Sequence, residues 1–343
     1  LIVRSGATVN APNIAHFVAT TDSSNAGIAN LTAGDSGSII TLTNSGVGSY
    51  NLVGGAGVDV LNAAEGSDTL FGQDGDDFLD GGLGNDILTG GSHFDTFNVS
   101  SGTDRITDLA TGDILIVSYG ATANATDISL FTATNATSNR GTANVVAADA
   151  GSTITLTNSA VGPYNIFGGS GVDVLTGANE SDYIRGNSND DILDGAGGSD
   201  TLRGGDGNDT FKITSGTDLI NDLTTGDILI VSAGATANAQ NVSHFIATSA
   251  TSNAGTANLT ASNDGATITL TESSLGAYTI TGGSSIDSLT GDVDADTLQG
   301  GDGADTLVGG NGNDLYLFNT GDVDNGESIV EDPGGGSDAV AIL

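Results

Sequence analysis

Apolar residues recur at every ninth position in three blocks of the chain and alternate with polar residues elsewhere. Within the blocks, this position is Leu, Ile, Phe or Tyr in all fourteen units, for example Leu61, Ile184 and Tyr316. One apolar residue between two polar neighbours predicts a short strand whose central side chain points inward. Outside the blocks, stretches such as residues 153–157 (Thr-Ile-Thr-Leu-Thr) alternate as half-buried strands do. The pattern therefore predicts an all-β chain.

A nine-residue unit, Gly-Gly-x-Gly-x-Asp-x-Leu-x, underlies the three blocks, and residues 204–212 give one copy of it. Glycine in the first positions permits turns with positive φ and lets backbone carbonyl groups point inward. The sixth position is Asp in every unit: Asp59, Asp68, Asp77, Asp86, Asp95, Asp173, Asp182, Asp191, Asp200, Asp209, Asp287, Asp296, Asp305 and Asp314.

These residue types at this spacing point to calcium. Calcium is a hard cation that takes six to eight oxygen ligands at about 2.3–2.6 Å. One carboxylate and the carbonyls of one turn supply about half of such a shell, so a second, stacked turn is needed to complete it. A Gly/Asp-rich turn without metal is the simpler alternative, but the stacked carboxylates would then repel one another.

The blocks closely resemble the parallel β-roll of RTX proteins, which carry haemolysin-type nonapeptide repeats. The resemblance implies a right-handed coil with two nonapeptides in each turn. It also implies ions between loops n and n+2, held by the sixth-position Asp and early-loop carbonyls, which gives about 8 calcium ions. The carbonyl ligands implied for this chain are those of Gly55, Gly57, Gly75, Gly82, Gly84, Gly169, Gly171, Gly205, Gly207, Gly283, Gly301, Gly303, Gly310 and Gly312.

The second unit of each block departs from the pattern. Residues 63–66 (Ala-Ala-Glu-Gly) lack the first two glycines, whereas residues 177–180 (Gly-Ala-Asn-Glu) and 291–294 (Gly-Asp-Val-Asp) lack the second and fourth. We expect weaker calcium sites at these loops, because the carbonyl positions lose the freedom that glycine gives them.

A larger repeat of 114 residues contains the blocks, since Leu1-Ile2-Val3 recurs as Leu115-Ile116-Val117 and Leu229-Ile230-Val231. The Ser/Thr/Ala-rich stretch before each block has a tight turn between two alternating runs, for example at residues 252–255, which we interpret as a hairpin. The predicted fold is a series of right-handed parallel β-roll blocks alternating with hairpin-containing β segments in an elongated tandem array. The predicted modules are 1–114 (β segment 1–53, β-roll 54–98, connector 99–114), 115–228 (β segment 115–167, β-roll 168–212, connector 213–228) and 229–343 (β segment 229–281, β-roll 282–317, cap 318–343).

The charge balance limits the partners of the chain. It has 43 Asp and Glu against 6 Lys and Arg, for a net charge of -37. This excess argues against nucleic acid or an anionic membrane surface as a partner and favours cations. The chain has no Cys, which excludes disulfides and thiolate metal sites. No apolar run approaches the ~18 residues of a membrane span, and the first residues do not resemble a signal peptide.

We expect the protein not to be an enzyme. Residues 34–37 (Gly-Asp-Ser-Gly) match the surroundings of a serine nucleophile, but a turn explains them better because the other copies lack the serine. Neither His-Glu-x-x-His nor Gly-x-Ser-x-Gly is present. The three His do not recur between copies, which argues against a zinc site.

Three functions fit these observations. The first is a calcium-dependent structural repeat region of a secreted surface protein, such as an adhesin stalk, an S-layer or a filament subunit, with neighbouring copies as its partners. The second is the secretion and folding module of an RTX enzyme or toxin, and the third is a glycan- or cell-binding module. The resemblance implies type I secretion and folding outside the cell. Outside the cell, a site whose calcium concentration is a hundred times its Kd adds roughly 2.7 kcal/mol to the stability of the folded chain.

Overall fold

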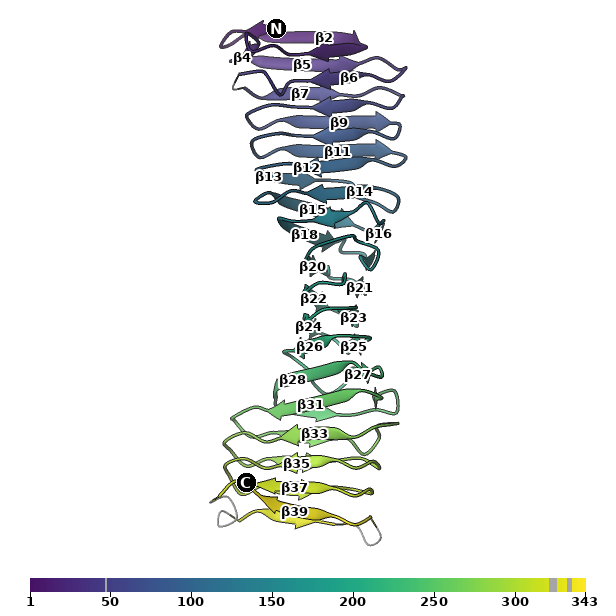
Figure 1. Cartoon of the computed structure of the whole chain (residues 1–343), viewed down its shortest axis with the longest axis vertical. Helices are drawn as coiled ribbons and strands as arrows, with labels where there is room; N and C mark the ends of the chain where they lie inside the picture. Colours follow the sequence, from purple (N-terminus) through teal and green to yellow (C-terminus); the bar gives the residue numbers. More distant parts are fainter. Residues whose placement is uncertain (47, 321–325, 332–334) are drawn as a thin grey trace. The chain divides into compact units, whose positions relative to one another are not determined.

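The computed structural model describes residues 1–46, 48–320, 326–331 and 335–343. The chain forms two compact units, Leu1–Gly169 and Ser170–Leu343. Each unit is a parallel β-solenoid, and together they contain about 17 turns. Within each unit the strands lie one above the other (Figure 1). The described residues contain strands but no helix, so the all-β prediction and the parallel coil are confirmed. No helix that could cross a membrane is present among them.

Unit 1 has two main parallel sheets on opposite sides of a narrow interior. A short pair, β1 (Ile2–Val3) with β4 (Ser24–Asn25), and a second pair, β16 (Leu130–Thr132) with β19 (Thr153–Thr155), add a further side. The first sheet runs in the order β2 (Thr8–Ile14), β5 (Ile28–Ala33), β7 (Tyr50–Val53), β9 (Thr69–Asp74), β11 (Ile87–Ser92), β13 (Thr103–Ile106), β15 (Thr122–Ile128), β18 (Thr142–Ala147) and β20 (Asn165–Phe167). The second is β3 (His16–Val18), β6 (Ile39–Thr41), β8 (Val60–Asn62), β10 (Phe78–Asp80), β12 (Thr96–Val99), β14 (Ile114–Val117) and β17 (Ser138–Asn139).

Unit 2 repeats this plan with three parallel sheets. Its first sheet is β22 (Tyr183–Ser188), β24 (Thr201–Asp206), β26 (Thr217–Ile220), β28 (Thr236–Val242), β31 (Thr256–Ala261), β33 (Tyr278–Thr281), β35 (Thr297–Gln299), β37 (Leu315–Phe318) and β39 (Ala339–Ile342). Facing it are β21 (Val174–Thr176), β23 (Ile192–Asp194), β25 (Thr210–Ile213), β27 (Ile228–Val231) and β30 (Ser252–Asn253). The third sheet is β29 (His244–Ile246), β32 (Thr267–Thr269), β34 (Ser288–Thr290), β36 (Thr306–Val308) and β38 (Ser328–Val330).

The nonapeptide blocks form narrow turns, each made of two units and two strands. Thr69 pairs with Ile87 and Leu70 with Leu88, a step of 18 residues that matches two nonapeptides. The eighth-position side chains fill the interior, where Leu70 and Leu88 are fully buried. Because each turn places its apolar residue directly above the last, the interior is one continuous stack of aliphatic and aromatic side chains.

The segments between the blocks form wider turns of the same solenoid. Thr122 pairs with Thr142, 20 residues on, and Leu130 with Thr153, 23 residues on. A wide turn has three strands in place of two, such as β15, β16 and β17, which accounts for the extra residues. The wide and narrow turns therefore share one parallel stacking pattern and differ in the number of sides in each turn.

The predicted hairpins are wrong, because the runs that flank each tight turn pair in parallel with the turns above and below. In unit 2, β29 pairs with β32, and β31 pairs with β28 and β33. The turn is a corner between two sides of the coil, at which Asn253 Oδ1 accepts the Gly255 N–H at 3.1 Å. Asn253 Nδ2 donates to the Ala277 carbonyl of the next turn at 2.5 Å. Two strand-like runs around a tight turn look the same in sequence whether the chain reverses or rounds a corner.

The 114-residue repeat has a structural counterpart. The seven-residue strands β2, β15 and β28 begin at Thr8, Thr122 and Thr236, and each has an irregularity at the same place in its pairing. The division into three modules remains a prediction. In the predicted cap, β38 and β39 pair in parallel with β36 and β37, whereas residues 321–325 and 332–334 lie outside the described residues.

Candidate metal sites

The sixth-position aspartates lie at the corners of the narrow turns, each directly before a strand. Asp59 precedes β8 and Asp68 precedes β9, so successive units place their aspartates at alternate edges of the coil. All fourteen are 3% exposed or less. The sequence therefore folds with its most regular acidic residues inside, where an ionised carboxylate is costly unless it is paired or bound to a metal.

Within each edge, the aspartates form a ladder through their backbone. The Asp59 N–H donates to Asp77 Oδ1 at 2.7 Å, and the Asp77 N–H donates to Asp95 Oδ1 at 2.9 Å. The other edge has the same bond from Asp68 to Asp86, at 2.8 Å. Each step spans 18 residues, so every carboxylate is fixed to the turn before it.

The second carboxylate oxygen faces its own loop. In the first turn of two blocks it accepts a loop N–H, from Gly55 to Asp59 Oδ2 at 2.6 Å and from Gly283 to Asp287 Oδ2 at 2.7 Å. Further along the ladders, one oxygen is buried with no hydrogen-bond partner among the described residues. These atoms are Oδ2 of Asp77, Asp86, Asp191, Asp200 and Asp314.

Two of these unpartnered oxygens, Asp77 Oδ2 and Asp191 Oδ2, lie beside a space that the position-one glycine of their unit leaves open. A Cβ built on Gly72 would lie 2.4 Å from Asp77 Oδ2 and 2.4 Å from the carbonyl oxygen of Gly90. We call this arrangement the oxygen cradle: the space beside a position-one glycine, bounded by the Asp of its own unit and the position-one carbonyl of the next turn. Six glycines have it: Gly54, Gly72, Gly177, Gly186, Gly282 and Gly291. In four of them the Asp Oδ2 also accepts an N–H of its own loop, whereas at Gly72 and Gly186 it has no hydrogen-bond partner among the residues that the structure describes.

The atoms of the cradle fit calcium. They are carboxylate and carbonyl oxygens that can only accept, and no donor lies among the nearest atoms at Gly72. Buried acceptors without donors repel one another unless a proton or a cation lies between them. Hard oxygen ligands from two successive turns are those that calcium prefers.

Burial and mutual repulsion raise the pKa values of the ladder carboxyls. Loss of solvation raises the pKa of Asp68 to about 7 and that of Asp95 to about 7, and in Asp95 the neighbouring carboxylates Asp113 and Asp77 add to the increase. In the buried pair of Asp200 and Asp218, burial likewise raises the pKa of both groups. Without a cation, these carboxyl groups stay protonated at pH values well above those at which an aspartate usually ionises.

The glycines predicted to supply carbonyl ligands lie in the same loops, and several of their carbonyls meet the next turn. Gly55 accepts the Asp74 N–H at 3.2 Å, Gly283 accepts the Asp302 N–H at 3.1 Å, and Gly84 accepts the Thr103 N–H at 3.1 Å. Their role as calcium ligands remains a prediction.

The second units of the three blocks differ in which glycines they lack. The units that begin at Gly177 and Gly291 lack the second and fourth glycines, but they keep the glycine at position one and the oxygen cradle. Ala63 occupies position one of its unit, and its Cβ takes the space that glycine leaves open elsewhere. The weaker site is therefore expected at the Asp68 loop.

Sequence reasoning missed four rungs of the ladders. The Asp86 N–H donates to Asp104 Oδ1 at 3.0 Å and the Asp95 N–H to Asp113 Oδ1 at 2.9 Å. Unit 2 has the same bonds to Asp218 and Asp227. A signal was available, since these aspartates continue the nine-residue spacing after the position-one glycine has been lost.

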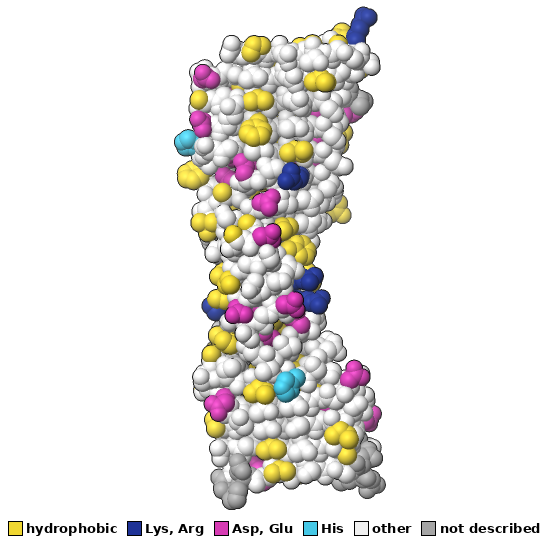
Figure 2. Space-filling model, turned by 180° about the vertical axis from the view of Figure 1, so that it is seen from behind, with side chains coloured by type: hydrophobic (Ala, Val, Ile, Leu, Met, Phe, Trp, Pro, Cys, Tyr) yellow, Lys and Arg dark blue, Asp and Glu magenta, His cyan; other side chains and the backbone are white. Residues whose placement is uncertain are grey.

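The burial of the ladders leaves the surface less acidic than the net charge suggests. In Figure 2, most of the visible surface is neither hydrophobic nor charged, and acidic side chains are scattered over it. The regularly spaced carboxylates are inside the coil, where they face the loops of neighbouring turns rather than a partner surface.

A narrow parallel coil with buried aspartates at its corners defines a calcium-binding β-roll. The sequence model of the RTX calcium-binding nonapeptide repeat matches four segments of the chain, residues 53–88, 167–202, 185–220 and 281–316. The chain therefore contains RTX calcium-binding nonapeptide repeats. One matched segment extends to residue 220 and so includes Asp218, one of the rungs beyond the regular units. The search of curated proteins found no match.

Proposed function

We propose that this chain is a calcium-dependent structural repeat region of a secreted cell-surface protein, such as an adhesin stalk, an S-layer or a filament subunit. The observation that carries the proposal is the repetition of wide and narrow turns with the 114-residue period, since β2, β15 and β28 recur in register. A repeated scaffold sets length and stiffness, whereas an enzyme needs a single catalytic site. The role proposed is structural rather than catalytic.

Calcium couples this scaffold to its location. The narrow turns bury ladders of aspartates, so the coil closes only when a cation or protons neutralise them. At sub-micromolar calcium the ions contribute almost nothing, whereas a site with a Kd of about 10⁻⁴ M, typical of extracellular modules, fills at millimolar calcium. Such a chain stays open inside the cell and folds outside it.

The number of ions follows from the pairs of loops that stack on one another. We propose one ion for each pair of units that lie two apart in a block, which gives about 8 ions in the three blocks. Six of these pairs have an oxygen cradle, which supports the count. The pair that includes Ala63 is expected to bind most weakly.

RTX repeats are typical of extracellular proteins that leave the cell by type I secretion. We propose the same route and a bacterial cell-surface location for this chain, with neighbouring repeats or copies of itself as partners. The strongly negative net charge keeps open chains apart during export, because like charges repel.

Negative-stain images of the intact protein in calcium test the structural role. Rods or a lattice of regular repeat are expected. A compact catalytic head bearing a single short roll would instead favour the secretion module of an enzyme. Circular dichroism at pH 8 in calcium and in excess chelator tests the switch, since the β signal of the narrow turns is expected only in calcium.

A further inference from the structure

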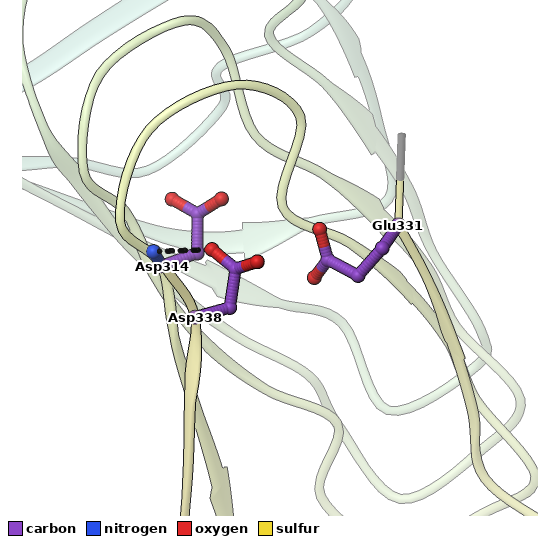
Figure 3. A group of neighbouring side chains, drawn as sticks. All are labelled: Asp314, Glu331 and Asp338. Carbon is purple, nitrogen blue, oxygen red and sulfur yellow. Dashed lines mark hydrogen bonds between the residues drawn. The ribbon is translucent and has the colours of Figure 1, made fainter. Parts of the chain in front are cut away.

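The last turn of unit 2 brings together three acidic side chains from two separate stretches of the chain. Asp314 lies in the last nonapeptide, whereas Glu331 and Asp338 follow β38 and precede β39. One carboxylate oxygen from each lies within 4.8 Å of the others. Figure 3 shows the three carboxyl groups facing a common space, with the Asp314 N–H donating to Asp338. Oxygens at such spacings can share one ion, because calcium–oxygen distances are about 2.3–2.6 Å.

A buried oxygen without a partner points into this cluster. Asp314 is 1% exposed, and its Oδ2 has no hydrogen-bond partner among the described residues. A Cβ built on Gly309 would lie 2.2 Å from this oxygen and 2.5 Å from the Tyr316 hydroxyl. The position-one carbonyl that bounds the cradle in other turns is replaced here by a side chain.

Tyr316 holds Glu331 in this arrangement. Its hydroxyl donates to Glu331 Oε1 and accepts the Gly309 N–H at 2.7 Å. Most eighth-position residues are aliphatic or Phe, whereas this unit has a hydroxyl that reaches the edge of the coil. Tyr316 is 1% exposed, so packing fixes the rotamer of its ring, and its hydroxyl holds the Glu331 carboxylate.

We propose that Asp314, Glu331 and Asp338 form a calcium site that fastens the closing turn, β38 and β39, onto the last nonapeptide turn. The site rests on the calcium function proposed above but uses a different ligand set. The regular loops offer one carboxylate and several carbonyls for each turn, whereas this site offers three carboxylates. Affinity rises with the number of charged ligands, so this site fills at lower calcium than the regular loops do.

Calcium titration of the full chain by isothermal calorimetry tests the site. Glu331→Gln is expected to remove one ion from the stoichiometry, the tightest one, or to lower its affinity at least tenfold. Glu272→Gln, an exposed residue far along the sequence from the site, is the matched control and is expected to bind as the wild type does. An unchanged number of ions with unchanged affinities in Glu331→Gln would overturn the proposal.

Two readouts separate the site from the general calcium function and from misfolding. Terbium bound here is excited through Tyr316, so Tyr316→Phe is expected to lower the sensitised emission of the first equivalent added, while the later equivalents keep theirs. Equal emission of the first equivalent in both proteins would contradict the assignment. If the wild type binds no calcium at all, the proposed function itself is wrong. If the wild type binds calcium and Glu331→Gln binds the same number of ions with the same affinities, only the proposal of this site is wrong.

Discussion

The narrow and the wide turns stack in the same way but have different residues at their corners. In unit 1, Ser38 stands directly before β6 in a wide turn, as Asp59 stands before β8 in the narrow turn that follows. The Ser38 hydroxyl is satisfied within its own loop, since it accepts the Gly34 N–H at 3.0 Å. Asp59 is fully buried and has an ionisable carboxyl group in place of a hydroxyl. One position on the coil thus changes from a neutral corner to an ionisable one.

This difference separates two sources of stability. The neutral corners of the wide turns close with hydrogen bonds alone, such as that from the Gly141 N–H to Asn139 Oδ1 at 3.0 Å. The charged corners of the narrow turns leave carboxylate oxygens such as Asp77 Oδ2 without a partner. We therefore expect calcium dependence in the narrow turns, although both kinds of turn have an apolar interior.

The largest effect is expected from pH in the calcium-free chain. Burial and like-charge repulsion raise the pKa of Asp95 and of Asp104 to about 7 in the folded state, against 3.8 for an ordinary aspartate. The folded state then binds more protons than the unfolded state between about pH 4 and 7, so folding stability rises as the pH falls through this window. Each pKa unit is worth about 1.4 kcal/mol.

Circular dichroism in chelator measures this prediction, with more β structure expected at pH 5 than at pH 8. Saturating calcium serves as the control, because protons compete with calcium for the same carboxylates and acid then weakens the fold. A calcium-free chain that loses structure on acidification would contradict the assignment of the ladders.

A methyl group in the oxygen cradle is expected to have the next largest effect. In Gly72→Ala the new Cβ would lie 2.4 Å from both Asp77 Oδ2 and the Gly90 carbonyl oxygen. We expect the loss of one ion and of about 3 kcal/mol in calcium. Gly34→Ala is the control, because the nearest atom to its Cβ would be 4.0 Å away. Calcium stoichiometry and denaturant unfolding measure both, and equal behaviour of the two variants would rule out the cradle.

Removal of a polar side chain from a neutral corner is expected to have a smaller effect, and that loss of stability does not depend on calcium. Asn139 is fully buried, and its side chain bonds to the Pro163 carbonyl and the Gly141 N–H. Asn139→Ala leaves both groups without this partner, at a cost of about 2 kcal/mol. The same loss is expected at every calcium concentration that keeps the chain folded, as measured by urea unfolding. The exposed Asn51→Ala is the control, and a loss of bound calcium in Asn139→Ala would break the distinction between the two kinds of corner.

The smallest effect is expected at a strained loop position. Ala196, the second residue of its unit, has φ +66°, where a side chain costs about 1–2 kcal/mol. Ala196→Gly relieves this strain but gains backbone entropy in the unfolded state, so a net stabilisation of about 0.5–1 kcal/mol is expected. Ala178 holds the same place in its unit without positive φ, and Ala178→Gly is expected to destabilise the chain in the same thermal unfolding assay. A shift of the same sign in both would exclude this explanation.

The sequence predicted the narrow turns well because their chemistry is local. One Asp and one apolar residue in every nine set both the corner and the inward side chain, so Asp59 and Leu61 could be placed without a structure. The wide turns were misinterpreted because parallel pairing joins residues some 20 positions apart, as Thr8 and Ile28 show, and no local pattern records that partner. Asp104 and Asp113 were missed because glycine, rather than the spacing of aspartates, was taken as the mark of a unit.

Hydrogen exchange of the full chain at pH 8, followed by mass spectrometry across a calcium titration, tests the central claim most directly. Peptides that cover β9 and β11 report the narrow turns, and those that cover β15 and β18 report the wide turns. As calcium is withdrawn, the narrow turns are expected to lose protection first, at the calcium concentration where the bound ions leave. Narrow turns that keep full protection in excess chelator would show that the buried aspartates need no cation, and the account would be wrong.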